Sequence, residues 1–133
     1  MKKQEVIPVE QWKAMKKKIG KKKHSTKGVD DIAIMLNEAT LRFTKEYKFC
    51  DSRKFKFDFV INAYRGLKIE QKIAIEFEGL MSEKSGHTTI KGYTRNCEKY
   101  NLATVLGWKV LRYTIFNYHQ VIRDVKSIIE LGV

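Results

Sequence analysis

The sequence predicts an α/β fold in which a central mixed β-sheet is flanked by helices. Helical and strand-like periodicities alternate along the chain in the order helix, strands, helix, strand, helix. The 133 residues, 43% of them hydrophobic, suit one compact domain with a real core. Together these observations favour layers of helix packed around a sheet.

The first expected helix covers residues 29 to about 47. Apolar residues recur there at spacings of three and four from Val29 to Phe43, which is typical of one buried helical face. Asp30 and Asp31 lie near its N-terminus, where the helix dipole favours negative charge. These features predict an amphipathic helix.

Two strands are expected next, at residues 55–61 and 72–79. In FKFDFVI and in KIAIEFEG, aromatic and isoleucine residues occupy every second position, as in a half-buried strand. A turn-like segment, Tyr64-Arg65-Gly66, lies between them and suits an antiparallel hairpin. If the apolar sides share one core, the carboxylates of Asp58, Glu76 and Glu78 gather on the opposite face.

The remaining elements follow a polar segment at residues 79–92, which is long for a passive connection and reads as a functional loop. A second helix is expected at residues 95–106 and ends at Gly107, a residue suited to the C′ position. A third strand at 108–114 and a final helix at 121–131 complete the domain.

Basic residues are concentrated in an arm, residues 1–28, which precedes the predicted domain at residues 29–133. The arm holds ten lysines and two glutamates and so contributes +8 of the net charge of +12. Lysines in such a run bind phosphates by releasing condensed counterions, and a solvated tail is the alternative. The residues expected to contact nucleic acid there are Lys16, Lys17, Lys18, Lys21, Lys22 and Lys23.

No membrane partner is expected, because the sequence has no run of roughly 18 to 20 uncharged apolar residues and no signal-peptide pattern. Cys50 and Cys97 belong to no CxxC or Cys/His cluster, so neither a disulfide framework nor a zinc site is indicated. We expect a cytoplasmic protein.

Three gathered carboxylates would repel one another, and a hard divalent cation would relieve that repulsion. Mg²⁺ takes carboxylate, water and phosphate oxygens and lowers the pKa of bound water, so the implied substrate is a phosphodiester. The alternative is that Asp58, Glu76 and Glu78 are ordinary solvent-facing residues paired with nearby lysines or arginines.

The series FDFV, IAIEFEG, GH and RNCEKYNLATVLGWKVLRYT resembles the PD-(D/E)xK nuclease superfamily, in particular the branch similar to very short patch repair endonucleases and their phage relatives. The resemblance covers about residues 29–131, and EKYNLATVLGWKVLRYT is its most specific part. It implies a restriction-endonuclease-like core, with Mg²⁺, or Mn²⁺ in its place, as the cofactor and DNA as the partner.

By this resemblance Asp58 and Glu76 are metal ligands and catalytic residues. The chain departs from the pattern where Glu78 replaces the motif lysine, and Glu78 then becomes a further ligand or orients the attacking water. Lys99, in the second helix, is the candidate for the missing cation, with a solvated helix lysine as the alternative.

Four further residues are candidates for the site, two of them by the resemblance. It gives Glu38 as an added metal ligand, although an i, i+4 pair with Arg42 fits equally well. His87 resembles a loop histidine near the scissile phosphate. For Arg95 and Arg112 we expect contact with nucleic acid, and for Arg112 a structural ion pair is the equal alternative.

The sequence is therefore interpreted as a small metal-dependent DNA endonuclease of phage or mobile-element type. A different class is the first alternative: an inactive, nuclease-like DNA-binding or assembly module in which Glu78 has removed the lysine. A third hypothesis is an RNA-binding protein. Enzymes of this size that cut both strands often act as homodimers, but no dimer face is indicated.

Overall fold

The computed structural model describes residues 27–79 and 89–133. Helices and strands alternate along this part of the chain, with two short 3-10 helices between them. In chain order the elements are α2 (Lys27–Glu38), β1 (Arg42–Lys48), β2 (Lys56–Ala63), η1 (Ile69–Gln71), β3 (Ile73–Phe77), α3 (Ile90–Val105), β4 (Lys109–Tyr113), η3 (Tyr118–Gln120) and α4 (Val121–Leu131).

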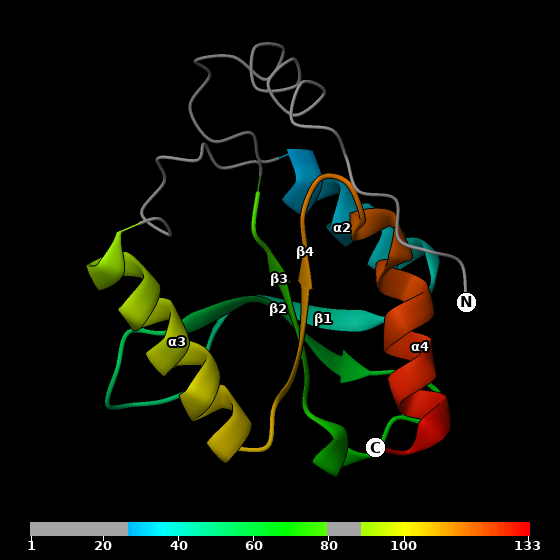
Figure 1. The fold of residues 1–133 in the computed structure, drawn as a ribbon. Helices are drawn as coiled ribbons and strands as arrows, with labels where there is room; N and C mark the ends of the chain where they lie inside the picture. Colours follow the sequence, from blue (N-terminus) through cyan, green and yellow to red (C-terminus); the bar gives the residue numbers. More distant parts are fainter. Residues whose placement is uncertain (1–26, 80–88) are drawn as a thin grey trace.

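The sheet has four strands in the order β1-β2-β3-β4, with antiparallel β1/β2 and β2/β3 pairs and a parallel β3/β4 pair. The antiparallel β2/β3 pair confirms the predicted hairpin. Helix α3 provides the long crossover that a parallel pair requires. Helices lie on both sides of the sheet (Figure 1), so the predicted α/β class with a mixed, helix-flanked sheet is confirmed.

On one face of the sheet, α2 and α4 pack over an aliphatic core. Ile32 and Leu36 of α2 are fully buried there, as are Val121 and Val125 of α4. Leu41 follows α2 in the same cluster. The spacing of these residues by three and four positions is what turns one side of each helix toward the sheet.

On the other face, α3 lies over a smaller and largely aromatic core. Phe49, Phe55 and Phe57 stack there, and Val60 and Ala74 lie beside them. The helix itself buries only Ala103 completely. Helix α3 therefore keeps most of its side chains partly or fully exposed while it crosses the sheet.

The predicted first helix is too long, because residues 42–48 form strand β1. The helix ends at Glu38, and Thr40 then adopts a left-handed backbone with a φ of 60°. The helical spacing continues to Phe43 by coincidence, since that side chain stacks edge-on with Phe59 of the paired strand. Pairing with β2 overrides the local helical pattern.

The prediction that the three phenylalanines of FKFDFVI share one face is also wrong. Phe55 and Phe57 belong to the core under α3, whereas Phe59 belongs to the core under α2 and α4. Lys45 pairs with Phe59 and Tyr47 with Phe57, but the register has no pair between these two, and Glu46 has a left-handed φ of 48°. This irregularity interrupts the alternation between Phe57 and Phe59.

Two predicted boundaries shift. Helix α3 begins at Ile90, where the Thr89 side chain accepts a hydrogen bond from the Gly92 backbone, so part of the expected loop is helical. Helix α2 begins at Lys27, so the last two residues of the predicted arm belong to the folded domain. The C-terminal end of α3 is as expected, with Gly107 at a φ of 86°.

Candidate functional site

Strands β2 and β3 separate at Asp58. Phe59 pairs with Ile75 and Val60 with Ala74, so the next step in this register would set Asp58 opposite Glu76. The Phe77 backbone nitrogen does not donate to a backbone carbonyl of β2. It donates to the Asp58 carboxylate, at 2.7 Å. The separation of the strands therefore brings two carboxyl groups together at the end of β3.

Glu76 is a buried acid, with 7% of its surface exposed. Burial, followed by repulsion from Asp58, raises its pKa to about 8, although the nearby Lys99 ammonium acts in the opposite direction. Destabilisation of the ionised form of Glu76 beside a second carboxylate marks this position as a candidate functional site.

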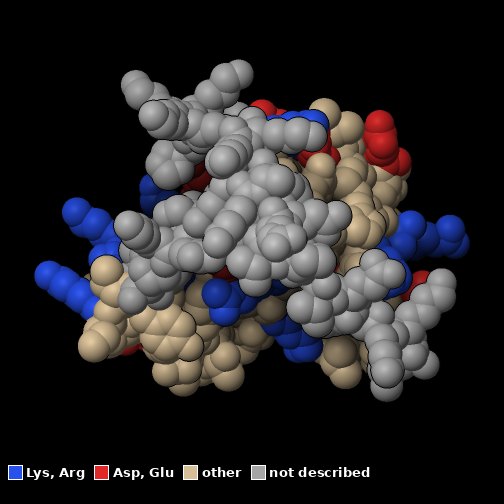
Figure 2. Space-filling view, turned by 45° about the horizontal axis from the view of Figure 1, so that its top comes forward, with Lys and Arg blue, Asp and Glu red and all other residues tan. Residues whose placement is uncertain are grey.

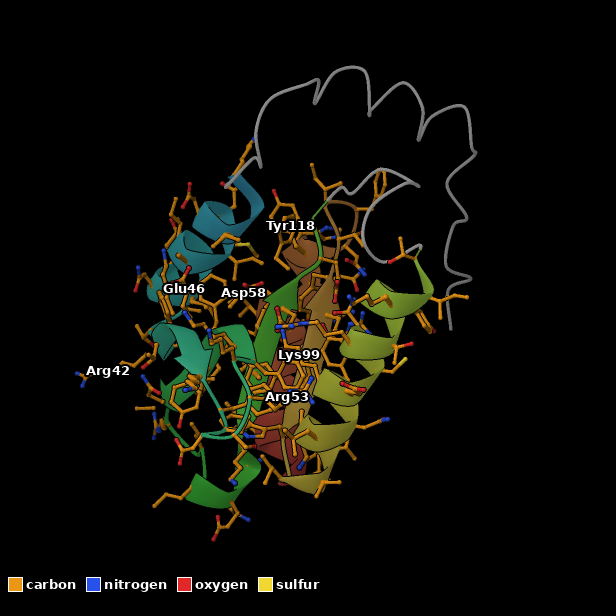
Figure 3. The ribbon with its side chains drawn as sticks, turned by 90° about the vertical axis from the view of Figure 1, so that its left-hand side faces the viewer. Arg42, Glu46, Arg53, Asp58, Lys99 and Tyr118 are labelled. Carbon is orange, nitrogen blue, oxygen red and sulfur yellow. The ribbon has the colours of Figure 1, made fainter. Side chains whose placement is uncertain are left out.

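Lys99 reaches this pair from α3. Its ammonium contacts Glu76 Oε1, and it also lies 5.8 Å from the centre of the Phe57 ring and 5.5 Å from that of Tyr100. Only 17% of the side chain is exposed. Figure 3 labels Asp58, which comes from β2, and Lys99, which comes from α3. The structure thus brings together Asp58, Glu76 and Lys99, three of the predicted site residues.

Glu78 was also predicted to belong to the site, but other partners hold its carboxylate. Its Oε1 accepts hydrogen bonds from Arg112 Nε at 2.6 Å and from Tyr100 Oη at 3.0 Å. The Arg112 guanidinium lies 4.0 Å from the centre of the Tyr100 ring. Contact with nucleic acid and a structural ion pair were the two roles expected for Arg112, and the structure contains the ion pair. Glu78 therefore ties β3, β4 and α3 together at the edge of the site.

The predicted group of three carboxylates does not form. Within residues 27–79 and 89–133, no three side chains of the Asp, Glu, His or Cys types converge as metal ligands would. Glu38 lies exposed in the last turn of α2, ten residues and so roughly 15 Å along the helix axis from Gly28, the end that packs on Phe77. Its alternative pairing with Arg42 across a helical turn is excluded, because Arg42 lies in β1.

Several predicted residues lie elsewhere. Arg95 is exposed on α3, four residues before Lys99, and stacks at 5.4 Å on Phe55. His87 lies outside the described residues, as do the six arm lysines from Lys16 to Lys23.

Sequence reasoning missed Tyr100, which forms one side of the site. Its hydroxyl donates to Glu78, and burial, together with Glu76 and Glu78, raises its pKa above the usual value of 10. The only available signal is its position directly after Lys99 on a helix. Nothing in the sequence pairs it with acids more than twenty residues earlier.

The pair Asp58 and Glu76 fits Mg²⁺ or Mn²⁺ on the chemistry of its donors. Mg²⁺ is commonly bound through one or two carboxylates, with waters and phosphate oxygens completing its shell. Two acids are therefore enough, and a cation beside them would offset the burial and the repulsion from Asp58 that raise the pKa of Glu76. Lys99 supplies part of that charge in this structure.

The described surface around this end of the molecule has a mixed charge. Figure 2 shows Lys and Arg side chains on both flanks, with Asp and Glu mainly along the upper edge. In the part of the chain that the structure describes, no helix has the length and apolar character needed to cross a bilayer.

Comparison with known proteins adds no relative. No protein-family model matches the sequence, and neither a curated protein nor a solved structure matches it significantly. A function for this protein therefore has to be inferred from the geometry of its own residues.

Proposed function

We propose that this protein is a metal-dependent DNA endonuclease with a restriction-endonuclease-like core. The observation that carries the proposal is the meeting of Asp58, Glu76 and Lys99 where β2 and β3 separate. Two acids and a lysine at the end of a central strand are the set that the PD-(D/E)xK resemblance implies. Here the lysine comes from a helix instead of the strand.

In this proposal Asp58 and Glu76 hold Mg²⁺ or Mn²⁺. The bound cation would supply Lewis acidity toward water and phosphate oxygens. The Asp58 carboxylate is already fixed by the Phe77 backbone nitrogen, so its orientation does not depend on the cation. Glu76 is fixed by burial and by Lys99.

Lys99 takes the role of the motif lysine that Glu78 replaces. Its ammonium is largely buried and lies against the Glu76 carboxylate, where it can donate to a water molecule or to a phosphate oxygen. A fixed positive charge in a poorly solvated site stabilises the negative charge that develops on the phosphate and leaving oxygens in hydrolysis. Glu78 is then a positioning residue, since Arg112 and Tyr100 occupy its carboxylate.

One observation favours a second candidate, an inactive nuclease-like DNA-binding or assembly module. The direct contact of Lys99 with Glu76 satisfies that carboxylate by an internal cation. A protein whose acids are neutralised in this way has no need of a metal. Metal dependence is the feature that separates the two candidates.

Cleavage of labelled DNA tests the proposal. The substrates are duplex, single-stranded, flapped, mismatched and four-way-junction DNA, each with Mg²⁺ or Mn²⁺ and with EDTA. Wild type is compared with Glu76→Gln, with Asp58→Asn and with Glu130→Gln, a control that alters an exposed carboxylate on α4. We expect metal-dependent cleavage that the first two variants lose and the control keeps.

Titration calorimetry with Mg²⁺ and Mn²⁺ separates the two candidates. Binding by wild type that Asp58→Asn and Glu76→Gln abolish supports the enzyme. DNA binding with no heat of metal binding and no cleavage would instead establish the inactive module.

A further inference from the structure

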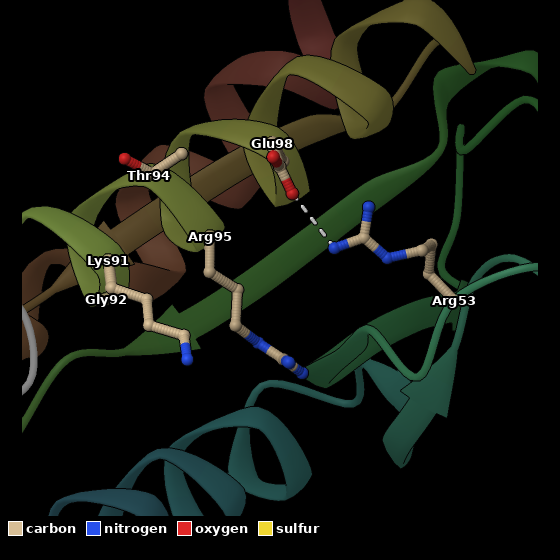
Figure 4. Close-up of a pocket in the computed structure, with 6 residues that line it drawn as sticks. All are labelled: Arg53, Lys91, Gly92, Thr94, Arg95 and Glu98. Carbon is tan, nitrogen blue, oxygen red and sulfur yellow. Dashed lines mark hydrogen bonds and ion pairs between the residues drawn. The ribbon is translucent and has the colours of Figure 1, made fainter.

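A second feature of α3 lies outside the carboxylate pair. It is an open groove of about 400 Å³ between the first turns of α3 and the segment that joins β1 to β2. We call it the α3 groove. Its lining residues are Arg53, Lys91, Gly92, Thr94, Arg95 and Glu98 (Figure 4).

The α3 groove has an excess of positive charge. Three cationic side chains line it, and Glu98 is its one carboxylate. Arg53 and Glu98 form an ion pair of 2.9 Å in which 44% and 51% of the two side chains remain exposed. Lys91 and Arg95 extend from α3 toward the side from which Arg53 enters (Figure 4). An anion entering the groove would therefore meet cations from two segments of the chain.

The two guanidinium groups have a common support. Arg53 lies 4.4 Å and Arg95 5.4 Å from the centre of the Phe55 ring. Phe55 is only 3% exposed and stacks on Phe49 within the core. Because the ring is fixed, stacking limits the freedom of both arginines, and less entropy is lost when they bind a ligand. Planar guanidinium groups held in this way match the oxygens of a phosphate.

We propose that the α3 groove binds the phosphodiester backbone of a nucleic acid strand beside the carboxylate site. The placement beside a scissile phosphate rests on the proposed function. Arg95 and Lys99 are one helical turn apart, about 6 Å along the axis. A strand whose phosphate enters the groove would therefore place a neighbouring phosphate close to the carboxylate site.

Glu98 acts as a competitor for the phosphate in this proposal. Its carboxylate occupies Arg53 in the free protein and is displaced when a phosphate enters. Removal of its charge should then strengthen binding, whereas removal of either arginine should weaken it. A merely structural ion pair predicts that loss of either partner acts in the same direction.

Binding of fluorescent single-stranded DNA and RNA of equal length, in EDTA and at several salt concentrations, tests this by anisotropy. We expect Arg53→Ala and Arg95→Ala to weaken DNA binding about threefold to tenfold and to reduce the salt slope by about one. Glu98→Gln should strengthen it severalfold. Arg42→Ala, at an exposed residue of β1 that points away from the groove (Figure 3), should change it less than twofold.

The proposal is overturned if wild type binds neither strand, if the arginine variants bind like Arg42→Ala, or if Glu98→Gln weakens binding. Thermal unfolding by circular dichroism confirms that each variant is folded. If the variants rank as expected in RNA binding but wild type does not bind DNA, the groove is a phosphate-binding site whose ligand is RNA. Binding is measured in EDTA and so does not depend on cleavage. If the variants rank as expected in binding but the protein cuts no DNA with Mg²⁺ or Mn²⁺, the proposed function is refuted and the proposal for the α3 groove stands.

Discussion

The two faces of the sheet differ in how their helices are held. Under α2 and α4, eleven buried residues form one core, and the polar groups there are joined in pairs, such as Tyr113 with Asp124 and Tyr118 with Asp31. Under α3 the core has six buried residues, and cations lie over its aromatic rings.

This difference indicates a division of labour. The α2 and α4 face supplies most of the apolar burial, which is the main source of stability. The α3 face supplies Lys99 and the α3 groove, which is lined by the exposed side chains of Arg53, Lys91 and Arg95. Substitutions should therefore separate stability from activity according to the face on which they lie.

The largest expected effect is on the α2 and α4 face. Leu36→Ala removes a fully buried side chain and should lower the free energy of unfolding by about 2–5 kcal/mol. Leu102→Ala, at a partly buried residue of α3, should cost about 1 kcal/mol. Urea unfolding of both variants measures the contrast, and equal losses would contradict the division between the faces.

The next effect concerns Gly28, whose backbone lies against the ring of Phe77. A Cβ atom at Gly28 would lie 2.1 Å from Phe77 Cζ, so Gly28→Ala must displace the ring. We expect a loss of about 1–3 kcal/mol by thermal or urea unfolding. Asn37→Ala, at an exposed residue of the same helix, is the control and should change stability little.

A rescue variant shows whether the ring is the cause. Phe77→Leu added to Gly28→Ala should recover part of the loss, because the smaller side chain makes room for the methyl group. If the double variant is no more stable than the sum of the single losses predicts, the contact does not explain the effect.

The carboxylate site should be visible in the pH dependence of the metal-free protein. The pKa of Glu76 is about 8 in the folded state and 4.5 ordinarily, so the folded protein binds the proton more tightly. The free energy of unfolding should then fall as pH rises from about 4.5 to 8, by at most about 1.4 kcal/mol per pH unit. Urea unfolding at several pH values should show this slope in wild type and its loss in Glu76→Gln.

The smallest effect compares one tyrosine hydroxyl on each face. Tyr113→Phe removes the 2.7 Å hydrogen bond to Asp124 and should cost about 1 kcal/mol. Tyr100→Phe removes a 3.0 Å bond to Glu78, which keeps Arg112, and should cost about half as much. Tyr100→Phe should instead reduce cleavage. A larger loss of stability in Tyr100→Phe, together with a larger loss of cleavage in Tyr113→Phe, would contradict the division between the two faces.

The sequence predicted much of the fold because its periodicities match the packing. The helix of residues 121–131 was predicted with its observed bounds, and the pairing of the two central strands was predicted as well. Strand β1 was missed because Phe43 satisfies both a helical spacing and a cross-strand contact with Phe59. Local pattern cannot distinguish the two.

The candidate site was predicted in part for a similar reason. Asp58 and Glu76 lie in strands whose pairing was predictable, and Lys99 came from the resemblance. The capture of Glu78 by Arg112 was not predictable, since 34 residues separate them and only the parallel pairing of β3 with β4 brings them together.

The irregular strand β1 also bears on how two copies of the chain could meet. Within the described sheet β1 is an edge strand, and four of its seven residues are charged. The left-handed backbone at Glu46 bends that edge. Charge and bending both oppose the addition of a strand from another molecule, so a homodimer would have to form through a surface other than this edge.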